Sequence, residues 1–418
     1  MSAMPDPAAD APPFSVVLLD ANIGTYALAR AFHERYGVTS TVVTRVGTGA
    51  VSGSSIIDLV ELGLQSTRQD VLETLLRIGR ERQGGPPTLL LGNSDFTAAF
   101  LSTNREALAP YYLSPILPLD TLGRISDKGH FAELSESLGI ATPATVVVDV
   151  AAEGEDDAVT RLPFSYPVVV KAASTAAYEE LSFPGKRKVY VLSTPDEVAE
   201  LVRTLRGVGY RNRLVVQELV GGDDQHMRSI TAYRDQFGTV TLLASARVIV
   251  EEHAPLTLGN PAAMVTTAYE DAWEQAERFL HAVDYHGFAN FDLKQDPADG
   301  TLKFLEVNPR IGRNNYYVTA AGANVSQFVV ADLVQGLALE PQRVREQVLY
   351  SVIPYPLLTR YATDPELRSQ VRSLRRGMVH PLSYRGDSWR RKGYLWTSKA
   401  NHVRKFARYY PRPTGTGF

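Results

Sequence analysis

Apolar, β-rich runs alternate with helical segments over the first quarter of the chain, and this alternation most constrains the fold. Asn22 and Gly24 open a helix that Gly37 ends. Further helices are predicted at 68–82 and 95–108, and buried strands at 14–20, 38–45 and 88–93. Strands that alternate with helices over short connections form a parallel sheet covered by those helices. The first part of the chain is therefore predicted to be an α/β domain.

Strands dominate the chain after a second region opens near Ser126. A helix is predicted at 126–139, and further helices at 195–206, 268–283 and 324–337. The predicted strands lie at 144–150, 167–173, 188–192, 213–220, 229–235, 239–251, 288–294 and 303–308. Long antiparallel strands with helices on one side indicate an α+β unit. The fold class is thus α/β and α+β, in several domains.

Composition excludes several classes of protein. The 418 residues include no cysteine, which excludes disulfides, thiolate metal sites and a cysteine nucleophile, and fits a reducing compartment. A net charge of −3 does not suggest a dedicated nucleic-acid binder. No apolar run reaches the roughly 18 residues of a membrane span. Residues 1–13 lack the features of a signal peptide and are expected to be a mobile tail. The expected location is the cytoplasm.

Two carboxylates and an amide make up the strongest constellation of polar residues. Asp292 lies in FANFDLK, and Glu306 and Asn308 lie in FLEVNPR, with the turn sequence DPADG between the two strands. Glu306 and Asn308 are two residues apart and share a face, and hairpin pairing can bring Asp292 opposite them. These oxygen ligands suit Mg²⁺ or Mn²⁺ on phosphate oxygens. A solvated polar face is the alternative, but apolar neighbours on both strands favour the metal site.

Cationic residues lie near this hairpin in the sequence or interrupt apolar strands. Arg310 and Arg313 follow Asn308 directly and suit carboxylate and phosphoryl oxygens, although surface arginines in a loop are the alternative. Lys171 interrupts the apolar strand PVVVKAA and needs an anion or solvent. The small and hydroxyl residues at 173–186 are typical of a mobile flap that binds phosphate. Lys128, near the start of its helix, carries little signal alone.

Two other segments have some features of nucleotide-binding sites. The strand VVQELV runs into the turn GGDD at 221–224, and its end can offer backbone groups to an adenine edge. The glycine-rich GTGAVSG at 47–53 is a near miss for a dinucleotide fingerprint, because its third glycine is one residue late and no clear helix follows. It is predicted to be a flexible loop.

Taken in order, these elements resemble the ATP-grasp enzymes. Within that superfamily the chain is similar to the carboxylate–amine ligases, and most of all to the D-aspartate ligases of peptidoglycan cross-bridge synthesis. E-V-N-P-R at 306–310 is specific only to the superfamily, whereas EEHAP, LGNPA and GRNNYYVT together indicate the branch. The matching segments span nearly the whole chain: YALARAFHERYGVTS, GDDQHMRSITAY, EEHAPLTLGNPA, GFANFDLK, NPRIGRNNYYVTAAGAN and MVHPLSYRGD.

The resemblance implies a role for each matching residue. Arg310 would steady an acyl phosphate, and Arg247 stands where the superfamily places a basic phosphate contact and the D-aspartate branch carries histidine. Two Mg²⁺ ions would be bound by Asp292, Glu306 and Asn308. ATP would be bound through its phosphates by Lys128 and Lys171, and through its adenine and ribose by Gln217, Glu218, Leu219 and Val220, with Asp224 nearby.

The implied reaction is ADP-forming and has two steps. A carboxylate attacks the γ-phosphoryl group of ATP, and an amine then displaces phosphate from the acyl phosphate. For D-aspartate, Arg313 is the candidate for the spare α-carboxylate and Glu252 for the ammonium. The acceptor would be the lysine amine of a peptidoglycan precursor. An amino-acid ligase of a small-molecule pathway and a non-catalytic nucleotide-binding protein are the alternatives, and the oligomeric state stays open, a homodimer included.

The resemblance and the composition together predict the domains. A Rossmann-like pre-ATP-grasp domain is expected at 14–122 and an ATP-grasp domain at 123–339, with a lid at about 140–215 and a catalytic sheet at about 216–339. A basic extension follows at 340–418, where Asp387 is the sole acid among the cations from Arg372 to Arg412. This extension is expected to be either a solvated face or a peripheral docking surface for an anionic precursor or membrane.

Overall fold

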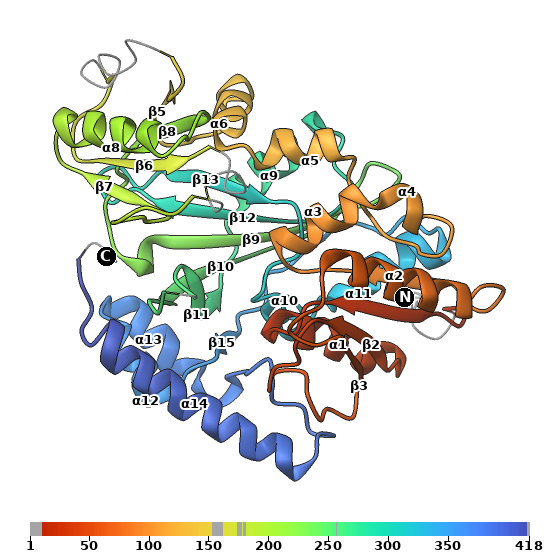
Figure 1. The fold of residues 1–418 in the computed structure, drawn as a ribbon. Helices are drawn as coiled ribbons and strands as arrows, with labels where there is room; N and C mark the ends of the chain where they lie inside the picture. The colour runs from red at the N-terminus through yellow and green to blue at the C-terminus, as the bar shows by residue number, and fades with distance from the viewer. Residues whose placement is uncertain (1–10, 153–161, 174–177, 179–180, 256, 416–418) are drawn as a thin grey trace. The chain divides into compact units, whose positions relative to one another are not determined.

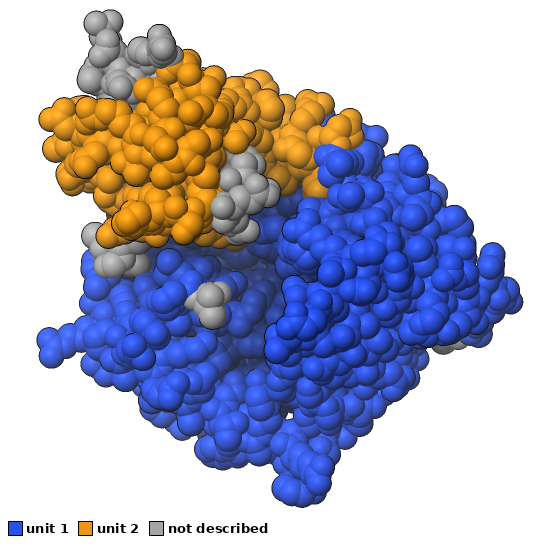
Figure 2. All heavy atoms as spheres, in the orientation of Figure 1, with its two compact units in different colours: residues 1–119, 223–291, 308–418 blue, residues 120–222, 292–307 orange. Residues whose placement is uncertain are grey.

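The computed structural model describes residues 11–152, 162–173, 178, 181–255 and 257–415. The predicted tail at 1–13 and the predicted flap at 173–186 lie partly outside these residues. The chain forms two compact units, which are coloured in Figure 2. Unit 1 contains residues 1–119, 223–291 and 308–418, and unit 2 contains residues 120–222 and 292–307. The domain boundaries given above stay a prediction.

A four-stranded parallel sheet in unit 1 confirms the predicted α/β region (Figure 1). Its order is β3-β2-β1-β4, with β1 at Ser15–Leu19, β2 at Ser40–Thr44, β3 at Ile57–Glu61 and β4 at Thr88–Leu91. Alternate residues of β1 enter two cores, because Val16 packs with α1 (Ile23–Tyr36) and Val17 with α2 (Arg68–Glu81) and α3 (Asp95–Thr103). Burial on both faces explains the continuous apolar run. The sequence did not predict β3, of whose residues only Ile57 is buried.

Local capping residues set the helix boundaries in this region. The Asn22 side chain accepts hydrogen bonds from Gly24 N and Thr25 N at 2.7 and 3.2 Å, and Gly37 ends α1 with a φ of 66°. The single helix predicted at 95–108 is wrong, since α3 stops before Asn104 and α4 (Arg105–Leu108) follows. Asn104 donates its side-chain amide to Phe100 O at 2.8 Å, a local bond that competes with helix continuation.

A second sheet of seven strands has the order β13-β12-β9-β10-β11-β15, with β14 paired to β10. Its strands are β9 (Met227–Arg234), β10 (Val240–Glu252), β11 (Asn260–Thr266), β12 (Gly287–Gln295), β13 (Leu302–Asn308), β14 (Gln342–Arg343) and β15 (Leu349–Ser351). The associated helices are α9 (Glu270–Ala282), α10 (Tyr316–Ala320) and α11 (Val325–Val330). The helix predicted at 324–337 becomes α11 followed by a π-helical turn at Ala331–Gln335. The sequence missed β11, which begins with the turn-like pair Asn260-Pro261.

The third sheet, in unit 2, is antiparallel in the order β5-β8-β6-β7. Its strands are β5 (Thr145–Asp149), β6 (Val168–Ala172), β7 (Tyr190–Leu192) and β8 (Arg213–Glu218). Val168 and Val170 of β6 pack with Val198 and Leu205 of α8 (Pro195–Gly207). Because side chains alternate along a strand, Lys171 points to the face opposite α8. The same unit contains α6 (Lys128–Ser137) and nearly all of α5 (Leu119–Ser126).

The basic C-terminal extension is largely helical, with α12 at Tyr355–Tyr361, α13 at Pro365–Ser373 and α14 at Trp389–Tyr409. The long helix α14 is drawn in blue in Figure 1. Its buried Arg391 anchors it to the rest of unit 1. Arg391 pairs with Asp387 at 3.4 Å and donates to the carbonyl oxygens of Gly49 and Ser52. The loop at 47–53 therefore contacts α14 through the Arg391 side chain. Within the described ranges, no helix is both long and apolar enough to cross a bilayer.

Gly24 at the start of α1 lies against the segment that follows β13. A Cβ atom on Gly24 would lie 2.0 Å from Asn93 Nδ2 and 2.8 Å from the Cα of Arg313. Gly24 O also accepts a hydrogen bond from Asn315 Nδ2 at 3.2 Å. The close approach of two backbone segments therefore requires glycine at this position.

We expect Gly24→Ala to lower the free energy of unfolding by roughly 2–3 kcal/mol, because the Arg313 backbone must move to admit the methyl group. Urea unfolding of the variant and the wild type measures this loss. Gly123→Ala in α5 is the matched control, since a Cβ there meets no atom within 4 Å and alanine favours helix. Equal stability of Gly24→Ala and the wild type would contradict the packing described here.

Candidate active site

The hairpin β12–β13 carries the two candidate metal-binding carboxylates. Asp296 N donates to Thr301 O, and Gly300 N donates to Asp296 O, both at 2.8 Å, so the turn between the strands forms where predicted. Asp292 and Glu306 are half-buried, and Asn308 lies two residues beyond Glu306 on β13. Among the described residues no three His, Cys, Asp or Glu side chains cluster as a metal site. A cation held here would need the Asn308 oxygen and ligands from outside the protein, such as phosphate.

Four charged side chains gather within unit 2. Lys128 Nζ lies 3.6 Å from Glu306 Oε2. Burial lowers the pKa of the Lys171 ammonium, the carboxylates of Glu306 and Asp292 oppose this effect, and Lys128 and Lys188 reinforce it. The net pKa of Lys171 is lowered. The structure therefore brings together Lys128, Lys171, Asp292 and Glu306, here called the charge cluster.

Helix α6 fixes the position of Lys128 in the charge cluster. Asp127 caps the helix by accepting hydrogen bonds from Gly129 N at 2.9 Å and His130 N at 3.0 Å. Arg213 of β8 pairs with the other oxygen of Asp127 at 3.2 Å. Lys128 is the first residue of the helix, so its backbone is held by the cap while its side chain reaches Glu306.

The predicted adenine-binding strand has specific partners inside unit 2. Gln217 is buried and donates to Thr145 Oγ1 at 3.0 Å. Glu218 accepts from Ala144 N at 3.1 Å and pairs with Lys303, which also lies 3.0 Å from Asp296. Val220 is buried and Leu219 is half-buried. The Glu218 carboxylate is therefore neutralised by Lys303, a contact that sequence reasoning did not predict.

Asp224, in unit 1, is buried and bonded to neighbouring residues. Its Oδ2 accepts from Glu251 N at 3.0 Å and lies 2.9 Å from His253 Nε2. The His253 ring stacks on Tyr410 with centroids 3.6 Å apart. These contacts give Asp224 a structural role in joining β10 to the end of the chain, while its predicted place near a nucleotide stays a prediction.

The two arginines implied in phosphate chemistry are each held by carboxylates in unit 1. Arg310 Nε lies 2.9 Å from Asp95 Oδ1, and its Nη2 donates to Asn308 Oδ1 at 3.2 Å. A carbonyl oxygen has two lone pairs, so the Asn308 oxygen can accept Arg310 and still ligate a cation. Arg247 donates to Gln225 O at 3.2 Å and lies 3.6 Å from Asp364 Oδ2.

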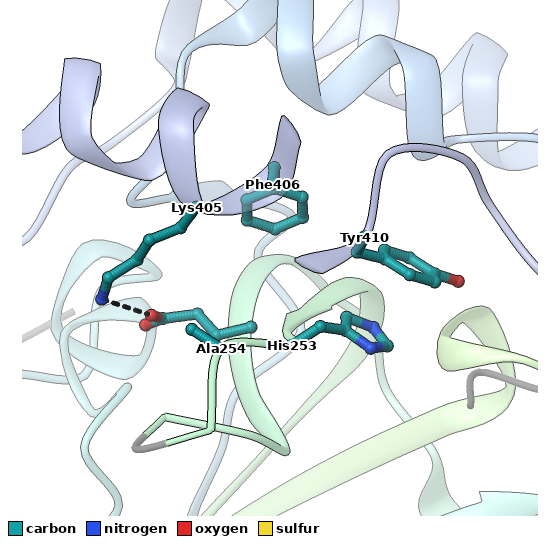
Figure 3. Close-up of a pocket in the computed structure, with 6 residues that line it drawn as sticks. His253, Ala254, Lys405, Phe406 and Tyr410 are labelled. Carbon is teal, nitrogen blue, oxygen red and sulfur yellow. Dashed lines mark ion pairs between the residues drawn. The ribbon is translucent and has the colours of Figure 1, made fainter. Parts of the chain in front are cut away.

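Glu252 and Arg313, the candidate amino-acid ligands, form an ion pair with each other at 2.8 Å. Glu252 is only 2% exposed, and it lines a small pocket with His253, Ala254, Lys405, Phe406 and Tyr410 (Figure 3). Its Oε1 bonds Arg313, whereas no hydrogen bond to Oε2 is found within the described part of the chain.

Two basic side chains of α14 lie beside the second oxygen of Glu252. His402 Nε2 is 3.8 Å and Lys405 Nζ is 3.9 Å from Oε2, the latter drawn dashed in Figure 3. Burial alone would raise the pKa of the Glu252 carboxyl, but His402 and Arg313 outweigh burial and lower the pKa to about 2. Glu252 therefore stays ionised at neutral pH.

Sequence reasoning missed His402, Lys405 and Asp20 as neighbours of the candidate residues. His402 and Lys405 lie about 150 residues from Glu252 in the chain, and their i, i+3 spacing was the only available signal. Asp20 follows β1 with a φ of 77°. Burial raises the pKa of its carboxyl, while Ser94 and Arg310 oppose that rise. The available signal for Asp20 was its position directly after a buried strand. The strand order reverses direction between β1 and β4, and ligands of α/β sheets bind at such a point.

Comparison with known sequences supports an ATP-binding domain around the charge cluster. Residues 127–328 match the family "Carbamoyl-phosphate synthase L chain, ATP binding domain". The chain is 29% identical over 323 residues to a D-aspartate ligase of Enterococcus faecium, covering 77% of each chain. It is 36% identical over 103 residues to an N5-carboxyaminoimidazole ribonucleotide synthase of Brucella melitensis, covering 24% of this chain and 27% of the relative.

Solved structures share the fold at low sequence identity. An L-amino acid ligase from Bacillus licheniformis superposes with a TM-score of 0.53 at 18% identity, covering 78% of this chain and 75% of that one. The N5-carboxyaminoimidazole ribonucleotide synthetase of Thermus thermophilus gives a TM-score of 0.56 at 22% identity, with 80% and 82% covered. The predicted ATP-grasp fold is confirmed. The matched ATP-binding domain and the similarity to a D-aspartate ligase make the chain similar to the ATP-grasp ligases.

Proposed function

We propose that this ligase activates the β-carboxylate of D-aspartate with ATP and joins it to the lysine side-chain amine of a peptidoglycan precursor. The observation that carries the proposal is the charge cluster, which lies inside the matched ATP-binding region. Similarity to a D-aspartate ligase over most of both chains supports the choice of amino acid. ATP as co-substrate suggests that the reaction occurs in the cytoplasm.

The hairpin residues fit a divalent cation. Two carboxylates and an amide oxygen are hard ligands of the kind that Mg²⁺ and Mn²⁺ prefer, and phosphate oxygens would complete the coordination. Asp292, Glu306 and Asn308 would hold the metal, and we propose two ions. When bound, the metal would neutralise charge on the ATP phosphates.

The remaining steps are assigned to side chains of the protein. Lys128 and Lys171 would hold the phosphates while a carboxylate oxygen attacks the γ-phosphorus and ADP leaves. The lowered pKa of Lys171 shows a cation that is poorly solvated. Such a cation gains more than an exposed one from pairing with an anion. Arg310, oriented by Asp95, would steady the acyl phosphate, with Arg247 as a further phosphate contact.

The end of β8 and the residues directly after it are proposed to recognise the nucleotide. Gln217, Glu218, Leu219 and Val220 would contact the adenine and ribose, with Asp224 nearby. The side chain of Gln217 is anchored by Thr145, and that of Glu218 by Lys303. Because both side chains are held, the backbone at this strand end keeps its donors and acceptors at constant positions. We therefore propose that the backbone makes most of the contacts to the base.

Arg313 and Glu252 are proposed to bind the amino acid. Glu252 fixes the orientation of Arg313 through Oε1, so the guanidinium is prepared for an α-carboxylate. Glu252 Oε2 makes no hydrogen bond in the described structure and is the acceptor available to a substrate ammonium. Lys405 would have to yield to the ammonium, since both cations require the same oxygen.

Product analysis by mass spectrometry tests the substrates directly. The enzyme is incubated with ATP, Mg²⁺, D- or L-aspartate, and a lysine-containing muropeptide precursor or a panel of free amino acids. A precursor enlarged by one aspartyl residue, formed from the D-isomer only, is expected. Dipeptides without precursor modification would instead identify an amino-acid ligase of a small-molecule pathway.

Asp292→Asn should lower the rate of ADP formation at least about a thousandfold, because one metal-binding carboxylate loses its charge. A coupled assay for ADP at saturating ATP measures the rate. Asp299→Asn is the matched control, since Asp299 is exposed in the turn of the same hairpin and should leave the rate unchanged. A folded Asp292→Asn enzyme with near wild-type turnover would exclude the proposed metal site.

Glu252→Gln should raise the KM for aspartate and lower the free energy of unfolding at neutral pH by roughly 3 kcal/mol, because the half-buried Arg313 and Lys405 lose their buried counter-charge. The folded-state pKa of about 2 lies below the ordinary value of 4.5, so the stabilisation is present above pH 4.5 and is lost as pH falls towards 2. Urea unfolding at several pH values should show that this part of the acid dependence disappears in the variant.

The exposed Glu274→Gln on α9 is the control for this experiment and should behave as the wild type. If Glu252→Gln kept both the wild-type stability and the wild-type acid dependence, the ion pairs around Glu252 would be energetically irrelevant.

A further inference from the structure

The outward face of α14 carries a line of large apolar side chains. Trp389, Trp396 and Val403 are spaced seven residues apart, so they follow one another along the helix with a drift of only about 20° per step. Their exposed fractions are 78%, 77% and 42%. Gly393 and Ala400 fall between them on the same face, and Ala407 follows Val403 there. We call Trp389, Trp396 and Val403 the outer stripe.

Cations flank the outer stripe on both sides. At 100° per residue, Lys392 and Lys399 fall on one side and Arg390, Arg404 and Arg408 on the other. The helix contains seven Lys and Arg and no acid, whereas the whole chain has a net charge of −3, so the rest of the chain is net acidic. The positive charge is thus concentrated around exposed indole rings.

The inner face of α14 is anchored, so the outer stripe has a fixed outward orientation. Arg391, His402 and Phe406 are the buried residues of the helix. Arg391 lies over the Tyr26 ring at 4.7 Å, and Phe406 packs edge-on against Tyr361 with ring centroids 5.2 Å apart. Turning the helix to hide its tryptophans would break both contacts and expose Arg391.

We propose that the outer stripe and its flanking cations dock this protein on the surface of a membrane rich in anionic phospholipids. An interfacial helix lies in the membrane plane with tryptophan at the headgroup level and Lys and Arg beside it. The long basic side chains can reach phosphates while their stems cover apolar surface. Docking of this kind needs no spanning helix.

Other occupants of this face fit the chemistry less well. A second copy of the chain would place one acid-free cationic helix against another, and like charges would repel. A nucleic acid could stack bases on the indoles, but phosphate and base contacts give no reason for a valine and small residues aligned with the tryptophans on the same face. The proposal uses α14 alone and does not depend on the substrates proposed above.

Sedimentation with vesicles tests this proposal on the full-length protein. Vesicles of one third phosphatidylglycerol and two thirds phosphatidylcholine are compared with vesicles of phosphatidylcholine alone, at low and physiological salt. Binding to the anionic vesicles should be at least tenfold tighter, and salt should weaken it. The tryptophan emission should shift to the blue on binding, because Trp389 and Trp396 leave water while Trp273 is already buried.

Paired variants identify the surface. Trp389→Ala/Trp396→Ala should weaken binding to anionic vesicles at least tenfold, and Lys392→Gln/Arg404→Gln should do so by a similar factor, at roughly fivefold per cation. Tyr409→Ala is the matched control, because Tyr409 is an exposed aromatic residue of α14 on a different face and should leave binding unchanged. All these side chains are solvent-exposed, so ADP formation in solution should stay at the wild-type level.

Several results would overturn the proposal. They are equal affinity for the two kinds of vesicle, absence of binding to either, and unchanged binding in the double tryptophan variant. Binding of RNA oligonucleotides without binding of vesicles would assign the face to nucleic acid. A protein that ligates normally but does not bind vesicles would overturn this proposal alone. A protein that binds vesicles but does not ligate would overturn the proposed function alone.

Discussion

A lysine ammonium held in an apolar strand is the constraint on which the candidate site depends. Lys171 lies between buried valine and alanine residues on β6, and burial lowers its pKa. The carboxylates of Glu306 and Asp292 oppose that effect, while the positive charge of Lys128 reinforces it. The cluster thus combines two cations with two anions in one place. Such an arrangement favours ligands that carry both charge types, and a metal–nucleotide complex is one of them.

Much of the architecture follows from the pattern of apolar residues. The parallel sheet around β1, the capping of α1 and the hairpin β12–β13 were predicted because each depends on local sequence: a continuous buried run, an Asn cap with a glycine end, and a turn between strands. The break at Asn104 was missed because a side-chain bond to the backbone decided it. Strand β3 was missed because only one of its five residues is buried, so it lacks a continuous apolar run.

The charged partners were harder to predict than the strands. Asp292, Glu306 and Lys171 were recognised as polar residues within apolar runs, whereas Lys128 was implied only by the resemblance. The pairing of Glu218 with Lys303, of Arg310 with Asp95, and of Glu252 with α14 joins residues far apart in the chain. No periodicity encodes such contacts, because they depend on how whole elements pack. The basic extension was equally hard to predict in detail. Its composition predicted its positive charge but not which face of α14 is outward.

The charge cluster is proposed to serve phosphoryl transfer to a carboxylate, and isotopic oxygen can be followed from that carboxylate into phosphate. D-aspartate labelled with oxygen-18 in its β-carboxylate is ligated, and the released phosphate is analysed by mass spectrometry. One labelled oxygen is expected in each phosphate, because the attacking carboxylate oxygen leaves with phosphorus. Unlabelled phosphate, formed together with ADP and the ligated product, would exclude an acyl phosphate intermediate.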